Sequence, residues 1–515
     1  MSRQGSERHV SLFFELGLLG ALTLGSFAVR LLRLLESPEP PGTDGYYYVV
    51  QVEHLLAEGR LHVPDASWVL RLLGWGAWMA GDPIRGVKVM SALLAAVCVP
   101  AAWFAGTRLT RASGSEVPAE ASSLERERLG GWILALWAAA SPTLMQLAGD
   151  FPKTLGAVAP LLAVMGWGAT PRRGHWAILG GTVALLLAAT AHRLGASLLG
   201  LGGLGVLLGL GLRGRGTAPD RKWPILVAGG AALLGFMGLT ALLPNLLHPR
   251  DLERVATQLD LSLGLPPPFA WFKLRTAHPV QQVELGAAWA GLLLGAALLW
   301  RRRALRPVVC ALLLPLAVCL FPFWRRDVLD LGYRLSLLAP LLAVSLAVLA
   351  LPARPPAWAR SRGFMLATLV LVGVTRGGFE PSQTPPYARY RRLIERMPRP
   401  LPELLIAHQG INFLYGHLTW HEAMAWAPEP DLDRTRIGRI VWGIRDGEWA
   451  AYAPSGQDLP TVLRLDSSYA YVREDVYEAF LARAKQEGDD DLLERLSDWR
   501  NPSQVRPPSL LRNRD

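Results

Sequence analysis

Cysteine is scarce in this sequence of 515 residues, with only three copies. Cys98, Cys310 and Cys319 lie in apolar segments, so we interpret them as small buried hydrophobic residues. This excludes a disulfide framework and a cysteine-based metal site. Acidic residues are outnumbered as well, 42 against 53 Lys and Arg, which gives a net charge of +11. Most basic residues lie in short loops between apolar runs, which indicates membrane orientation and not nucleic-acid binding.

Motifs for nucleotide-driven chemistry are absent too. The sequence contains no Gly-x-x-x-x-Gly-Lys-Ser/Thr loop, no dinucleotide fingerprint and no His-Glu-x-x-His motif. The sequence therefore argues against energy coupling to ATP within this chain. Three histidines near the C-terminus, His408, His417 and His421, have no metal-ligand spacing, and we expect them to serve local packing or the polar surface.

Long apolar runs are what the sequence does have. Apolar residues make up 51% of the chain. Runs of roughly 17–25 residues recur along it, which is the length that crosses a bilayer, and they predict about eleven transmembrane helices. Eight of these spans lie near Ser11–Val29, Val87–Thr107, Leu129–Ala148, Thr154–Ala169, from Trp176 to His192-Arg193, from there to Arg213, Trp223–Leu243 and Gly363–Thr375. The other three end at Arg301, at Phe321 and before Arg354. The fold class predicted is an α-helical polytopic membrane protein.

The distribution of arginine predicts the orientation of the chain. Arginine clusters follow every second span, starting after the second, and the positive-inside rule places these loops and the N-terminus in the cytoplasm. We expect an uncleaved first span and a location in the cytoplasmic (inner) membrane. The outward face then holds loop 31–86, the turn at Asp150, the pair His192-Arg193, a Pro-rich loop 244–284, the short loop before Arg334 and the C-terminal region.

The C-terminal region has a different composition. Hydropathy drops after Thr375, which divides the chain into a membrane region, residues 1–376, and an extracytoplasmic domain, residues 377–515. We expect a small α/β or α+β domain and a disordered tail after Pro502. Its predicted strands are Leu404–Ala407 and Arg439–Ile444, and its predicted helices are Asp475–Gln486 and Asp490–Trp499.

Two carboxylates lie at membrane boundaries on the outward face. Asp44 belongs to the stretch Pro41–Tyr48, and Asp150 to the stretch Gly149–Lys153. Aspartate is common in any turn, so each residue alone could be structural. Two carboxylates that meet at one cavity can instead bind a divalent cation such as Mg²⁺ or Mn²⁺, or one of them can act as a general base.

Cations accompany these carboxylates on a face where cations are usually sparse. Lys153, Arg193 and Arg334 lie at span ends and could neutralise a phosphate, with His192 as a further donor. The alternative is that each side chain simply reaches up to the lipid headgroups. Several cations beside two carboxylates favour a site.

Aromatic residues surround the same region. A short helix is predicted from Tyr46 to Glu58, and Tyr47 and Gln51 lie on one face of it near Asp44. Tyr333 precedes Arg334 and could be an aromatic platform for a substrate. The alternative for both tyrosines is a place in the interfacial aromatic belt.

This layout resembles the GT-C superfamily of membrane glycosyltransferases, which includes oligosaccharyltransferases, protein O-mannosyltransferases and lipid A aminoarabinose transferases. Asp44 matches the acidic position in the first outward loop of that superfamily, and Asp150 matches the one in the next outward loop. A neighbouring acidic pair at Asp44 and a Trp-Trp-Asp signature in the C-terminal region are both absent. A bacterial transferase that acts on lipid or polysaccharide is therefore closer than a sequon glycosylase.

The resemblance implies an inverting transfer of a sugar from a polyprenyl-phosphate donor to an envelope lipid, glycan or protein acceptor. It implies that Asp44 deprotonates or orients the acceptor, that Asp150 holds a metal or the donor sugar, and that the cations bind the donor phosphate. Two other functions fit the composition. A transporter or flippase would place polar groups at mid-membrane and show internal repeats, and a non-catalytic envelope scaffold would give the carboxylates no purpose.

Overall fold

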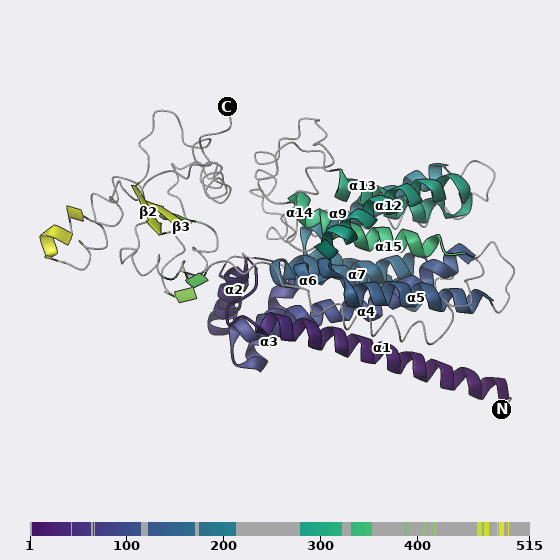
Figure 1. Cartoon of the computed structure of the whole chain (residues 1–515), viewed down its shortest axis with the longest axis horizontal. Coiled ribbons are helices and arrows are strands. Elements are labelled where there is room, and N and C mark those ends of the chain that lie inside the picture. Colours follow the sequence, from purple (N-terminus) through teal and green to yellow (C-terminus); the bar gives the residue numbers. More distant parts are fainter. Residues whose placement is uncertain are drawn as a thin grey trace.

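The computed structural model describes residues 3–42, 44–62, 65, 67–114, 122–169, 175–212, 279–321 and 331–352. In the C-terminal region it describes short pieces, residues 387–388, 391, 405–407, 414, 417–418, 461–465, 468–472, 481–482, 484–488 and 493. The described part of the chain before residue 353 is a bundle of long helices, with α2 and α3 at one end of it (Figure 1).

The helices have these bounds: α1 Arg3–Leu35, α2 Gly45–Glu58, α3 Trp68–Ala80, α4 Pro83–Gly114, α5 Ser122–Ala140, α6 Pro142–Asp150, α7 Pro152–Gly168, α8 His175–Ala191, α9 Arg193–Leu212, α12 Pro279–Arg301, the 3-10 helix η3 Arg303–Leu305, α13 Arg306–Leu320, α14 Leu331–Ser336 and α15 Ala339–Leu349. The short helix predicted from Tyr46 is α2, whereas α3 lies in what the sequence predicted to be a plain loop.

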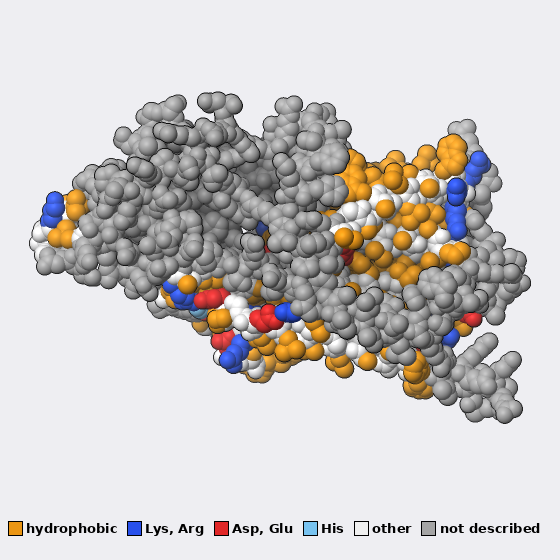
Figure 2. All heavy atoms as spheres, in the orientation of Figure 1, with side chains coloured by type: hydrophobic (Ala, Val, Ile, Leu, Met, Phe, Trp, Pro, Cys, Tyr) orange, Lys and Arg blue, Asp and Glu red, His pale blue; other side chains and the backbone are white. Residues whose placement is uncertain are grey.

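Several of these helices are long and apolar enough to cross a membrane. Five qualify among the described residues, namely Phe13–Leu35, Pro83–Ser113, Leu194–Leu212, Val283–Arg301 and Arg303–Leu320, and the bent pair α5 and α6 would make a sixth. Large hydrophobic side chains are exposed on their outer faces, as expected of lipid-facing helices (Figure 2). The prediction of a helical membrane protein is confirmed. The predicted spans at 223–243 and 363–375 lie outside the described residues, so the count of eleven stays a prediction.

Helix α4 is the central element of the bundle and packs against α1, α3, α5 and α7. Its contact with α5 requires small residues. A Cβ atom added at Gly106 would lie 2.2 Å from the carbonyl oxygen of Gly130, so the two backbones touch directly. Membrane helices gain most of their association from this close packing, because lipid provides no hydrophobic drive between them.

The predicted third span is not one straight helix. It breaks between α5 and α6 with a bend of 47°. Pro142 has no N–H, so the carbonyl of Ala138, four residues earlier, loses its helical partner. The buried Arg30 of α1 donates to that carbonyl over 2.7 Å and so compensates for the break.

The other side of this break is stabilised by Glu284 of α12. Its carboxylate accepts hydrogen bonds from the Ser141 hydroxyl at 2.7 Å and the Thr143 backbone N–H at 3.1 Å, and also one from Trp137 Nε1. Ser141 caps α6 through the N–H of Leu144. An acidic group is favourable at a helix N-terminus, so Glu284 fixes where α6 begins and hence where its last residue, Asp150, lies.

The two ends of the bundle differ in charge. At one end, Arg111 pairs with Glu127 at 2.6 Å, and Arg126 donates to the carbonyl of Leu351 at 2.6 Å. Basic side chains gather at this end in Figure 2. The described parts of the loops after the second and tenth predicted spans thus lie together, and Asp44 and Asp150 lie at the opposite end, which we call the carboxylate end. The orientation in the membrane stays a prediction.

Three short strands form an antiparallel sheet in the C-terminal region, in the order β1-β3-β2. They are β1 Leu405–Ala407, β2 Thr461–Leu465 and β3 Ser468–Val472. Strand β1 confirms the first predicted strand, whereas β2 and β3 were missed. The predicted strand Arg439–Ile444 and the tail lie outside the described residues, and the domain boundary stays a prediction.

Candidate functional site

The turn before α2 packs directly on the last residue of α6. Gly42 has a positive φ of 73°, which favours glycine. A Cβ atom at Gly42 would lie 2.2 Å from Asp150 Oδ1 and 3.0 Å from the carbonyl oxygen of Gly149. Asp44 follows two residues later and precedes α2. The two predicted carboxylates therefore belong to segments that touch at the carboxylate end.

Asp44 is paired with a predicted cation. The Nη2 atom of Arg334 lies 3.4 Å from Asp44 Oδ2, and both side chains are largely buried, at 23% and 15% exposed. The guanidinium of Arg334 lies over the ring of Phe151, 4.3 Å from its centroid. Its buried Nε has no hydrogen-bond partner within the described part of the chain. A buried unpaired donor on a cation is a ready contact for an anion.

Asp150 receives a hydrogen bond from Gln146, which lies one turn earlier on α6. As the last residue of α6, Asp150 lies at the negative end of the helix dipole. A cation or an acidic proton brought to this position would be stabilised. Gln146 was missed in the sequence, although an i, i+4 Gln–Asp pair is visible there.

Lys153 forms the second charged pair of the site. Its Nζ lies 2.6 Å from Asp65 Oδ2 and 3.4 Å from the Tyr47 hydroxyl. Gln51 donates to the same hydroxyl at 3.1 Å, and Lys153 also lies over the Tyr47 ring. The structure thus brings together three predicted residues, and it adds Asp65. Asp65 is one of seven acidic residues in loop 31–86, and no sequence signal distinguished it from the others.

His192 lies beside this cluster. Its Nδ1 accepts from the backbone N–H of Leu194 at 3.2 Å and lies 3.5 Å from the Thr154 hydroxyl, next to Lys153. The side chains of the two other predicted residues, Arg193 in α9 and Tyr333 in α14, lie outside the described part of the chain.

Residues far along the chain hold the turn in place. The Tyr387 hydroxyl donates to the carbonyl of Gly42 at 2.8 Å, and its ring meets that of Tyr46 edge-on at 4.9 Å. Arg391 pairs with Glu39 at 3.0 Å and donates to the Tyr46 hydroxyl at 2.8 Å. These contacts span more than 300 positions of sequence, and no local pattern indicates them.

Two tyrosines of α2, Tyr46 and Tyr48, remain neutral. Burial raises the pKa of Tyr48 well above its ordinary value, and the charge of Asp44 raises it further. Burial also raises the pKa of Tyr46, followed by the hydrogen bond to Glu39. A neutral hydroxyl is a donor, so these rings support the neighbouring carboxylates without adding negative charge.

The carboxylate end contains two carboxylates that could bind a metal ion, but the described residues do not form a complete set of metal ligands. Among the described residues no group of three or more His, Cys, Asp or Glu side chains could hold a metal ion. Asp44 and Asp150 still fit Mg²⁺, which usually keeps several waters and takes one or two carboxylates beside substrate phosphates. The metal stays a prediction.

Comparisons with known proteins add little to this geometry. No family model matches the sequence, and no curated protein matches it. A solved structure, the crystal structure of the Archaeoglobus fulgidus oligosaccharyltransferase in the apo form, is similar with a TM-score of 0.42 and 15% identity. The match covers 75% of this chain and 58% of that one. Similarity at this level assigns no function.

Replacing Lys153 with methionine is expected to destabilise the protein by about 1–3 kcal/mol, because it leaves a half-buried carboxylate without its cation. The free energy of unfolding in detergent measures this. Asp65→Asn in the same protein should recover part of the loss. If the two single losses simply add, the pair is not coupled and the account of this cluster is wrong.

Replacing Tyr387 with phenylalanine is expected to cost about 1 kcal/mol, because the buried carbonyl of Gly42 loses the shorter of its two hydrogen bonds and keeps only the one from the Gly45 N–H. Tyr387→Leu should cost more, since it also removes the ring that packs on Tyr46. Both losses appear as a lower melting temperature in detergent. Equal melting temperatures for all three proteins would show that the contact does not hold the turn.

Proposed function

We propose that this chain is a membrane glycosyltransferase of the GT-C type. It moves a sugar from a polyprenyl-phosphate donor to a lipid, polysaccharide or protein acceptor at the outer face of the cytoplasmic membrane. One observation carries the proposal. The turn that carries Asp44 packs against Asp150 at one end of an apolar bundle, Asp44 is paired with Arg334, and Lys153 is paired with Asp65 close by.

The cations would bind the donor phosphate. Arg334 has a buried Nε without a partner among the described residues, so this N–H can donate to an anion while Nη2 stays near Asp44. Lys153 adds a second positive charge nearby, and Arg193 is a further candidate. When the bond between the sugar and the phosphate breaks, negative charge grows on the leaving phosphate oxygen. Fixed cations stabilise this charge in a site with little water.

Asp44 would act as the general base. The acceptor hydroxyl oxygen attacks the anomeric carbon, its proton passes to the Asp44 carboxylate, and the bonding electrons leave with the polyprenyl phosphate. The positive charge of Arg334 favours the ionised form of Asp44, which is the form that accepts a proton. One direct displacement inverts the anomeric centre.

Asp150 would orient the donor sugar through its hydroxyl groups. Asp150 Oδ2 accepts from Gln146, and Oδ1 lies beside Gly42, in the turn that leads to Asp44. A divalent cation held by Asp44 and Asp150, if the enzyme uses one, would supply further positive charge next to the phosphate.

A transfer assay tests this proposal. The purified chain, reconstituted in lipid, is incubated with a set of polyprenyl-phosphate sugars and an envelope lipid extract, and products are identified by mass spectrometry. We expect one donor to yield a glycosylated acceptor together with free polyprenyl phosphate. Movement of an intact donor across the bilayer without any product would favour a flippase, and neither activity with any donor would favour a scaffold.

A further inference from the structure

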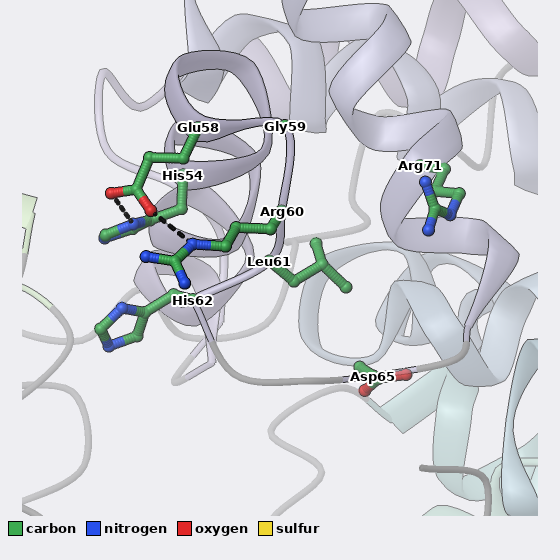
Figure 3. Close-up of a pocket in the computed structure, with 8 residues that line it drawn as sticks. All are labelled: His54, Glu58, Gly59, Arg60, Leu61, His62, Asp65 and Arg71. Carbon is green, nitrogen blue, oxygen red and sulfur yellow. Dashed lines mark hydrogen bonds and ion pairs between the residues drawn. The ribbon is translucent and has the colours of Figure 1, made fainter. Parts of the chain in front are cut away.

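We propose that α2 and α3 form a second binding site, for the phosphate headgroup of a membrane lipid. A cavity of about 470 Å³ opens between these helices. It is lined by His54, Glu58, Gly59, Arg60, Leu61, His62, Asp65 and Arg71 (Figure 3). The proposal rests on the proposed function in one respect only, that this lipid would be the sugar acceptor.

The carboxylates of the cavity are already neutralised. Glu58 receives Arg60 Nε at 2.9 Å and lies 3.2 Å from His54 Nδ1, as the dashed lines in Figure 3 show. Asp65 is paired with Lys153 at 2.6 Å. Neither acid therefore repels an incoming anion at full strength, and Arg71 is the cation of the lining that neither acid neutralises.

Two guanidinium groups remain available. Arg71 is exposed and has no hydrogen-bond or ion-pair partner in the described ranges of the chain. Arg60 is 81% exposed and contacts Glu58 through its Nε, so its two terminal nitrogens can still donate to a phosphate. Arginine suits phosphate because its planar donors match two phosphate oxygens at once. His62, whose ring lies 4.4 Å from that of His54, offers a further donor.

The surroundings of Arg71 point to a lipid and not to a soluble anion. Arg71, Trp75 and Trp78 follow i, i+4, i+7 on α3, so they share one face. The tryptophans are 53% and 69% exposed. Thirteen residues span only about 20 Å, too short to cross a bilayer, so α3 is expected to lie at the interface where tryptophan is favoured. Acyl chains can then follow the tryptophans while the phosphate reaches Arg71.

The cavity adjoins the carboxylate end through one shared side chain. Asp65 lines the cavity, and the same carboxylate contacts both Lys153 and the Tyr47 hydroxyl at 3.4 Å. A headgroup in the cavity is therefore one residue away from the proposed catalytic cluster. An acceptor bound in this way would hold its phosphate at α3 and extend its sugar hydroxyls toward the carboxylate end.

Binding of phosphatidic acid to the full chain tests the site without any sugar donor. Fluorescent phosphatidic acid is titrated into the protein in neutral detergent, with phosphatidylcholine and inorganic phosphate as separate arms. Arg60→Gln with Arg71→Gln is expected to weaken binding of phosphatidic acid about tenfold or more. Arg85→Gln, an exposed arginine at the start of α4 outside the cavity, is the matched control and should leave binding unchanged.

A second double variant tests whether the acyl chains of the lipid contribute to binding in addition to its phosphate. Trp75→Ala with Trp78→Ala should weaken phosphatidic acid and leave inorganic phosphate unaffected. Inorganic phosphate that binds as tightly as the lipid would overturn the lipid assignment. Equal binding by the double arginine variant, or equal binding of phosphatidylcholine, would overturn the site. Because no donor is present, these results stand apart from any failure of sugar transfer.

Discussion

Replacing Asp44 with asparagine is expected to lower the rate of sugar transfer by at least about 100-fold. The amide keeps the size of the side chain and can still contact Arg334, but it cannot accept the proton of the acceptor hydroxyl. General-base catalysis contributes roughly 10²–10⁴ in rate. The initial rate of product formation, normalised to folded protein, measures the loss. Asp150→Asn should lower the rate as well, since it weakens the hold on the donor sugar.

Glu36→Gln is the matched control for these variants. Glu36 is an exposed carboxylate just after α1 that pairs with Arg33 and lies outside the site. Its amide variant should transfer sugar at the rate of the unmodified protein. A rate for Asp44→Asn within about twofold of the control would remove Asp44 from the mechanism.

Replacing Gly42 with alanine is expected to damage both stability and activity. Alanine at the positive φ of this turn costs about 1–2 kcal/mol, and its Cβ would lie 2.2 Å from Asp150 Oδ1. The turn must move away from α6, and the relief of such overpacking costs a further ~1–3 kcal/mol. Asp44 moves with the turn, so transfer should fall by roughly 10²-fold. Melting temperature and transfer rate are measured on the same sample.

Gly81→Ala separates backbone strain from the clash. Gly81 also has a positive φ, 64°, but a Cβ there would meet no atom within 4 Å. We expect it to lose about 1 kcal/mol and to keep its transfer rate. If Gly42→Ala behaves like Gly81→Ala, the contact between the turn and Asp150 does not matter for function.

Most of the helices could be predicted from the sequence because membrane spans are defined by length and composition alone. Helix α2 was also predictable, since its polar face repeats at helical spacing. The break at Pro142 was not predicted. The backbone groups that the break leaves without helical partners are hydrogen-bonded by Arg30 and Glu284, which belong to helices far away in sequence.

The sequence predicted most residues of the candidate site, but it did not predict which carboxylate pairs with which cation. Charge topology grouped Asp44, Asp150, Lys153 and Arg334 on one side of the membrane, and the structure places them at one end of the bundle. Which carboxylate meets which cation depends on helix packing, so the pairing of Lys153 with Asp65 was missed. The contact of Tyr387 with Gly42 was missed for the same reason, because no periodicity links residues that distant.

A single-turnover experiment tests the central claim most directly. Radiolabelled donor, chosen by the panel assay, is bound to the protein in lipid, acceptor is added, and the label is followed for one turnover. The unmodified protein should convert the bound donor to glycosylated acceptor and free polyprenyl phosphate. The variant with both Asp44→Asn and Asp150→Asn should bind donor and leave it intact. Equal conversion by this double variant, or no conversion of any donor by the unmodified protein, would contradict the account.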